Sequence, residues 1–377
     1  MATRYSSRLR KRKCVEEISP ILALPAEIFI DIFLSLPVET IMQCRSVCKT
    51  WRDLLSTPYF AHLHFSKAQP RSLLFFCPCS GIKTSKKSKR FYCDIHSRRS
   101  SNINDATVST PAKLNLLKFT DHGEVVGSSN GLLCISEIVR KNKLYICNPL
   151  TGEYVEIPGP EVEKGWHASK PIEFFYSPQK NQYKILMYRE RKGHGFQKSG
   201  QIFTLGSNSW RNIDIPEHRK LHTAKRYISS FDMENEQARS IAVPDHIDLS
   251  TACLVVLGNF LCLYDNGYPQ FSIWLMKEYG VEEFWKHYVV QRSPNSHYRP
   301  ITVKEDGSIL MKHNSTTLIS YEPETKKSRA LYQFGPTGVV LHTPSFVSLK
   351  DLLIGGCCKV LNVRDRKRRS TINILEF

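Results

Sequence analysis

The stretch LYICNPLTGEYVEIP, residues 144–158, predicts two short strands joined by a turn, and it decides the fold class. Apolar residues flank its Asn-Pro and Thr-Gly pairs, which are residue types that favour tight turns. The same strand–turn–strand pattern returns in residues 201–216, 227–244, 272–290 and 317–331. Most of the chain is therefore expected to be β-structure built from repeated hairpins.

The repeats are spaced like the blades of a β-propeller. Successive turns are 58, 26, 45 and 45 residues apart. The spacings are measured at the residue before each turn, namely Cys147, Leu205, Phe231, Met276 and Tyr321. A period near 45 residues with several short strands per unit is typical of propellers. The spacing of 58 leaves room for an extra hairpin in residues 174–188, whereas the spacing of 26 is 19 residues short.

Short helices are expected ahead of the strands, in residues 24–65. Pro25 and Pro37 suit the first turn of a helix, since their missing N–H groups would be unpaired there anyway. Ser46 is the predicted N-cap of a third helix, which the Thr-Pro pair at 57–58 ends. The following segment, YFAHLHF, is predicted to add a final turn.

The first of these helices is apolar on nearly all sides. A unit of about forty residues buries too little apolar surface to be securely stable alone. Something outside the helix is therefore expected to cover it, either the rest of the chain or another protein. The apolar residues concerned are Ile28, Phe29, Ile30, Ile32, Phe33 and Leu34.

Residues 24–65 resemble an F-box. The family pattern has two Leu-Pro pairs, then Val-Cys-Lys-x-Trp, then Phe-x-x-x-His/Leu, and this chain has them at 24–25, 36–37, 47–51 and 60–64. The resemblance implies docking on the Skp-type adaptor of a cullin-based ubiquitin ligase. The implied adaptor-binding residues, which mix adaptor contacts with the unit's own core, are Leu24, Pro25, Ile28, Phe29, Ile32, Pro37, Val47, Cys48, Trp51 and Leu54.

Residues 127–349 resemble the F-box-associated, kelch-like domain of plant F-box proteins. The matching stretches, in family order, are GSSNGLLCIS, LYICNPLTGEY, FFYSPQKNQYKIL, FTLGSNSWRNI, FSIWLMKEYGVEEFW and VKEDGSILM. The family usually has an Asn-Gly-x-Leu-His-Trp strand pair after the Ser-Trp repeat, where this chain has only HRKLHTAKRYI at 218–228. The resemblance implies a mainly β fold, a small three-helix F-box followed by a kelch-like β-propeller in which one blade can be incomplete. TINILEF, residues 371–377, is a candidate strand for closing the ring.

The expected organisation is a basic disordered tail at 1–23, the F-box at 24–65 and the propeller domain at 66–377, with a disordered basic loop at about 83–113. The resemblance implies a substrate-recognition subunit of an SCF-type (Skp–cullin–F-box) ubiquitin ligase. It would bind the adaptor, and through it a cullin, and would hold an unidentified target protein on the β-domain. Such a subunit is non-catalytic and needs no cofactor or metal. Exposed candidates for target contact are the basic loop and the turn at 193–200.

The net charge of +18 is concentrated in three segments. Residues 1–13, 83–99 and 359–369 hold 19 of the 53 Lys and Arg and two of the 35 Asp and Glu, so the remainder is nearly neutral. In a nucleic-acid-binding protein, basic residues are expected over the folded surface. Nucleic-acid or chromatin binding is therefore the less favoured alternative. RLRKRK at 8–13 and RDRKRR at 364–369 are either nuclear-import signals or solvated tails. The expected location is the nucleus, the cytoplasm or both.

Membrane, metal and enzyme signatures are weak. IFIDIFLSL at 28–36 is too short to span a bilayer and contains an Asp, so no membrane association is expected. The 12 cysteines are expected to stay reduced inside a cell. A zinc site is the alternative to free thiols for one group of four residues, Cys77, Cys79, Cys93 and His96.

The sequence has no phosphate-binding glycine loop, no His-Glu-x-x-His and no Gly-x-Ser-x-Gly. Binding of a small ligand such as a sugar by the propeller stays open as a second alternative, which a deep apolar pocket would favour. Trp210, Trp274 and Trp285 are expected to be core or blade-packing residues, because large aromatic residues are mostly buried.

Overall fold

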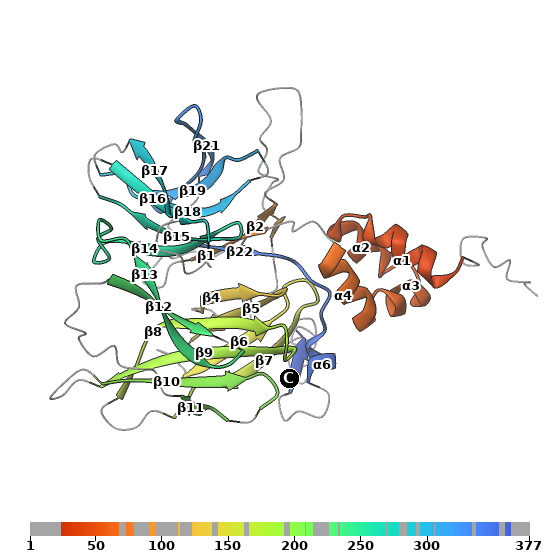
Figure 1. Ribbon diagram of the computed structural model, residues 1–377. Coiled ribbons are helices and arrows are strands. Elements are labelled where there is room, and N and C mark those ends of the chain that lie inside the picture. The colour runs from red at the N-terminus through yellow and green to blue at the C-terminus, as the bar shows by residue number, and fades with distance from the viewer. Residues whose placement is uncertain are drawn as a thin grey trace, which may run out of the picture.

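The computed structural model is mainly β, with a group of helices near the N-terminus that lies beside the sheets (Figure 1). Within the described residues, no helix is both long enough and apolar enough to cross a bilayer. The predicted tail at 1–23 lies outside the residues that the structure describes. The structure describes residues 24–67, 73–78, 91–94, 112–113, 123–137, 142–161, 166–191, 197–207, 209–213, 226–232, 234–267, 270–278, 285–291, 295–304, 306–333, 337–353 and 359–362.

The helical unit, residues 24–67, contains four helices. They are α1 (Ala26–Leu34), α2 (Val38–Cys44), α3 (Lys49–Leu54) and α4 (Pro58–Lys67). Pro25 and Pro37 directly precede α1 and α2 in extended conformation. The three predicted helices are confirmed as α1–α3, whereas the prediction of a final turn is wrong, because that segment is the ten-residue helix α4.

Side chains that accept bonds from backbone N–H groups explain where α3 and α4 begin. Cys48, and not Ser46, is the N-cap of α3, since its Sγ accepts a bond from the Trp51 N–H at 3.4 Å. At α4, Thr57 Oγ1 accepts from the Phe60 N–H at 3.2 Å. Proline follows it at the first helical position, so this Thr-Pro pair starts a helix as well as ending one.

Five sheets of four or five strands form full propeller blades. The first contains β4 (Glu124–Ser129), β5 (Leu132–Ser136), β6 (Lys143–Cys147), β7 (Glu153–Pro158) and the late strand β23 (Val360–Asn362). The second contains β8 (Trp166–Ser177), β9 (Gln182–Arg191), β10 (Gln197–Thr204) and β11 (Arg211–Ile213). The third blade contains β14 (Cys253–Leu257), β15 (Phe260–Asp265), β16 (Gln270–Met276) and β17 (Trp285–Gln291). The fourth contains β18 (Tyr298–Val303), β19 (Ile309–His313), β20 (Thr317–Glu322) and β21 (Lys327–Gln333).

The last blade closes the ring by joining the two ends of the β-domain. It contains β22 (Thr337–His342), β1 (Leu73–Pro78), β2 (Phe91–Asp94) and β3 (Ala112–Lys113), with β22 antiparallel to β1. The segment 371–377, predicted to close the ring, lies outside the described residues. The predicted loop at 83–113 is interrupted by β2 and β3, so the loop prediction is wrong for those strands. Phe-Tyr-Cys at the start of β2 is a run of strand-forming residues inside a basic segment.

The hairpins predicted from the turn pairs are confirmed. The antiparallel pairs are β6–β7, β10–β11, β16–β17, β20–β21 and the extra hairpin β8–β9. A sixth pair, β12 (Arg226–Asp232) with β13 (Gln237–Val243), forms a two-stranded sheet, and no further strand of that sheet falls within the described residues. This sheet lies between the second and third full blades in chain order, where the spacing was 19 residues short.

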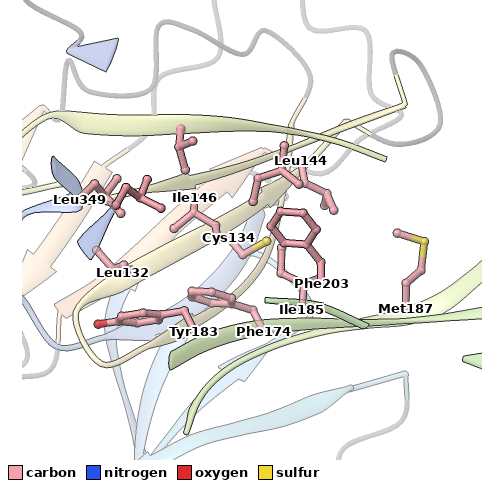
Figure 2. Packing of buried hydrophobic residues seen from close by; sticks show 13 residues of the cluster. Leu132, Cys134, Leu144, Ile146, Phe174, Tyr183, Ile185, Met187, Phe203 and Leu349 are labelled. Carbon is pink, nitrogen blue, oxygen red and sulfur yellow. The ribbon is translucent and has the colours of Figure 1, made fainter. Parts of the chain in front are cut away.

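Apolar clusters between neighbouring sheets form the core. The largest joins the first two blades, with Leu132 and Cys134 of one facing Phe174, Tyr183 and Phe203 of the other (Figure 2). Burial raises the pKa of the Cys134 thiol well above its ordinary value, so this thiol stays protonated. The prediction that the tryptophans are core or blade-packing residues is confirmed for Trp274, which is buried, while Trp210 and Trp285 are half-buried against such clusters.

The two-stranded sheet contacts the second blade mainly through charged groups. Lys184 of β9 is buried and donates to Glu236 at 2.8 Å, and Arg211 also pairs with Glu236. Burial pushes the pKa of Glu236 up, but the hydrogen bonds from the two bases hold it below its usual value. Nearby, Ser177 Oγ donates to Glu234 at 2.7 Å.

Candidate functional site

Helix α1 presents an apolar face to solvent. Ile28 and Ile32 lie one turn apart on it and are each 45% exposed. Leu24, one turn earlier, is 41% exposed, and Val47 in the turn before α3 is 66% exposed. We call Leu24, Ile28 and Ile32 the α1 face. Large apolar side chains left uncovered in this periodic arrangement are typical of protein surfaces that bind partners.

The opposite side of α1 forms the core of the helical unit. Phe29, Ile30 and Phe33 are buried there. The Trp51 ring packs on both phenylalanines, with ring centroids 5.8 Å from Phe29 and 5.1 Å from Phe33. These separations are within the range of favourable aromatic pairs, so Trp51 holds α3 against α1.

The structure therefore separates the ten residues that the sequence grouped together as adaptor-binding. Three are half-buried, namely Cys48, Trp51 and Leu54. Phe29 alone is buried. The six exposed residues, which remain available to a partner, are Leu24, Pro25, Ile28, Ile32, Pro37 and Val47.

The β-domain covers a different part of the helical unit. Phe346, from the segment after β22, packs against Phe60 and His64 of α4, with ring centroids 5.6 Å and 4.9 Å away. In Figure 1 that segment, in blue, runs out to α4 and returns to α6 (Leu349–Leu352). The alternative that the rest of the chain covers the helices therefore holds for one side of the unit, while the α1 face stays exposed.

The β-domain has a cleft of about 630 Å³ between the blades β14–β17 and β18–β21. Its lining combines apolar side chains, including Leu257, Ile273 and the exposed Phe260, with carboxylates at the turns. The carboxylates belong to Asp306, Glu322 and Glu324. Hydrogen bonds within the β18–β19 turn and Lys304 hold the pKa of Asp306 below its usual value although burial opposes this, so it is ionised at neutral pH.

Other predicted sites fall largely outside the described residues. Cys77 and Cys93 lie on β1 and β2, whereas Cys79 and His96 are among the residues that the structure does not describe. In the parts of the chain that it does describe, no three His, Cys, Asp or Glu side chains gather as a metal site would require. The turn predicted at 193–200 is described only from Gln197, where it belongs to strand β10.

Comparison with known proteins assigns both parts of the chain. Residues 79–336 match the model of the F-box associated beta propeller domain, and residues 21–66 match an F-box-like model. The F-box protein At3g07870 of Arabidopsis thaliana is 26% identical over 86% of this chain and 93% of its own length. The F-box protein CPR1 of the same plant is 26% identical over 82% of this chain and 84% of its length. Among solved structures, TolB from Acinetobacter baumannii reaches a TM-score of 0.28 at 10% identity over 70% of this chain and 53% of that chain, too low to add to the argument.

Proposed function

This chain belongs to the F-box proteins that carry an F-box-associated β-propeller domain, and we propose that it is the substrate-recognition subunit of an SCF-type ubiquitin ligase. Its helical unit would dock a Skp-type adaptor, and through it a cullin, while the β-domain holds a target protein. The observation that carries this proposal is the α1 face, since Ile28 and Ile32 stay exposed on a helix whose other side is fully packed.

The physical effect of such a subunit is proximity. A target lysine and a ubiquitin-charged enzyme meet slowly in solution. Both become parts of one complex when the helical unit binds the adaptor and the β-domain binds the target. Burying the α1 face against the adaptor would remove apolar surface from water, worth about 25 cal/mol per Å². No side chain of this protein is required to take part in covalent chemistry.

The adaptor contact is tested by exchanging exposed apolar residues for charged ones. We expect Ile28→Asp with Ile32→Asp to lower the affinity of the full chain for a purified Skp-type adaptor by at least about 100-fold, because two carboxylates would be desolvated in the interface. The matched control is Leu254→Asp with Val256→Asp, an apolar pair on β14 that is 52% and 61% exposed. Equal affinity in the parent and the α1 variant would contradict the proposal.

Trp51 is not a suitable probe of that contact. Its ring packs on Phe29 and Phe33 in the core, so its replacement would disturb the folding of the helical unit before any partner binds. The exposed pair on α1 separates binding from folding.

For the target we infer that the cleft between the two blades is the contact region. Its volume of about 630 Å³ is in the range of small-ligand pockets, which also favours the second candidate function, binding of a small ligand. Phe260→Asp, at the exposed rim, is expected to abolish co-precipitation of ubiquitinated proteins and to leave adaptor affinity unchanged. Retention of the same co-precipitated proteins would contradict this assignment.

We propose the nucleus, the cytoplasm or both as the location. The support is the pair of basic runs at 8–13 and 364–369, which lie outside the described residues. A fluorescent fusion with both runs replaced by Ser and Gly should lose nuclear signal if they are import signals. Salt-sensitive nucleic-acid binding that disappeared with the same replacement would favour the chromatin alternative.

A further inference from the structure

The helical unit and the β-domain meet at the segment 343–348, which we call the clasp. It follows the ring-closing strand β22 and precedes α6. Phe346 at its centre is 3% exposed. Among the described residues, the apolar cluster around Phe346 draws on the helical unit, on the clasp neighbour Val347 and on Leu150 of the β6–β7 turn.

Three side chains of the helical unit form the slot for the Phe346 ring. Phe60 and His64, one turn apart on α4, pack against it, and the His64 ring meets it nearly edge-on at an interplanar angle of 87°. The guanidinium of Arg45 lies 5.9 Å from the ring centroid, within the range of cation–π contacts. A large aromatic side chain between α2 and α4 thus joins the unit to the β-domain.

Hydrogen bonds from the first blade of the β-domain fix the backbone of the clasp. The buried side-chain amide of Asn148 donates to the carbonyls of Ser345 at 2.9 Å and Val347 at 2.7 Å, on either side of Phe346. The oxygen of the same amide accepts from the Leu150 N–H at 2.8 Å, so Asn148 ties the β6–β7 turn to the clasp. Because both ends of this amide are bonded, its position is fixed.

Two further contacts fix the ends of the clasp. Ser345 packs so closely on the β4–β5 turn that a Cβ at Gly131 would collide with the Ser345 Cβ. At the other end, Ser348 Oγ donates to Glu153 at 3.4 Å, and the N–H of Leu349, the residue after the clasp, donates to the same carboxylate at 2.8 Å. The clasp is therefore held at three places on the first blade, whereas it reaches the helical unit mainly through one ring.

We propose that Phe346 is a positioning residue, which fixes the orientation of the α1 face relative to the β-domain. Parts of a chain that share a small interface move relative to one another by default. A covalent connection alone would leave the orientation of the helical unit free, and the buried aromatic ring removes that freedom. The consequence for ubiquitin transfer rests on the function proposed above, but the rigid geometry does not.

The test measures the distance between the two parts in the full chain. Spin labels on unnatural amino acids at Arg52 of α3 and Glu156 of β7, both exposed, give the distribution by pulsed electron paramagnetic resonance. We expect one narrow distribution in the parent and a width at least doubled in Phe346→Ala. Phe346→Leu, which keeps an apolar side chain, should give an intermediate width and covers the case that the alanine variant folds poorly.

Leu254→Ala is the control, because Leu254 is an exposed apolar residue of β14 that does not line the cleft. Its distribution should equal that of the parent. Unchanged widths in both Phe346 variants, a broad distribution in the parent, or equal broadening in the control would each overturn the proposal. Adaptor affinity is measured on the same proteins and should stay within threefold; a parent that fails to bind the adaptor would refute the proposed function and leave the distance result to decide the clasp.

Discussion

The two sides of helix α1 differ in burial but not in composition. Phe29, Ile30 and Phe33 are buried on one side, while Ile28 and Ile32 remain exposed on the other. All five are large apolar residues, so hydrophobicity alone does not distinguish a core side from a binding side. The difference comes from what lies opposite: α3 packs its Trp51 on one side, and no described part of the chain covers the other.

The neighbours Ile32 and Phe33 give the largest expected contrast. Phe33→Ala should lower the free energy of unfolding of the helical unit by about 3–5 kcal/mol, because its ring is 2% exposed and packs on Trp51. Ile32→Ala should change it by less than about 0.5 kcal/mol. Urea unfolding followed by circular dichroism at 222 nm measures both. Similar losses in the two variants would show that α1 has no free side.

Acid should weaken the β-domain next to the clasp. His342, at the end of β22, is buried and its Nδ1 lies 2.8 Å from Ser128 Oγ of β4. Burial lowers its pKa from 6.5 to about 4. The unfolded chain therefore takes up a proton first as the pH falls, and between pH 6.5 and about 4 stability should drop by at most about 1.4 kcal/mol per pH unit.

The matched variant for this prediction is His342→Gln, which cannot titrate. Urea midpoints of the β-domain are compared at pH 7.5, 6 and 5. The variant should show a smaller loss between pH 7.5 and 5 than the parent does. An equal loss in both proteins would mean that other groups cause the acid sensitivity.

A buried amide should matter more than an exposed one. Asn148→Ala removes the donors to two clasp carbonyls and an acceptor in the β6–β7 turn, at an expected cost of about 2 kcal/mol in β-domain stability. Asn259→Ala, at an exposed turn of the cleft, should cost less than about 0.5 kcal/mol. Thermal denaturation of the full chain measures the pair. No difference between them would contradict the role given to Asn148.

The smallest effect is expected at Val47, which is 66% exposed. Val47→Ser should leave stability within about 0.5 kcal/mol of the parent. If Val47 belongs to the adaptor contact, affinity for the adaptor should fall a few-fold, as isothermal calorimetry would show. An unchanged affinity would confine the contact to the α1 face.

Local patterns predicted much of this fold. Turn residues predicted the positions of six hairpins, among them the Asn-Pro and Thr-Gly pairs that follow Cys147. Such residues, and the alternation of apolar and polar residues along a strand, are short-range signals. The start of α4 is not evident from the sequence, because a Thr-Pro pair is a signal both for the end of one helix and for the start of the next. Cys48 was missed as a cap because its sulfur is a weak acceptor that propensity rules rank below Ser46.

Long-range contacts were not predictable in the same way. Phe346 and Phe60 are in contact although most of the chain lies between them in the sequence. The residues around either one do not indicate that the other is its partner. The sorting of the adaptor-binding residues into exposed and buried depends on how α1 and α3 pack, which one apolar stripe leaves undetermined. The Glu236 contacts with Lys184 and Arg211 likewise join the two-stranded sheet to the second blade.

Hydroxyl-radical footprinting of the full chain, with and without the Skp-type adaptor, tests the central claim most directly. We expect oxidation of Leu24, Ile28 and Ile32 to fall at least fivefold on binding, while the exposed Phe260 and Val256 on the β-domain stay unchanged. Protection of the β-domain residues with no change at Ile28 and Ile32 would contradict the assignment of the α1 face as the docking surface.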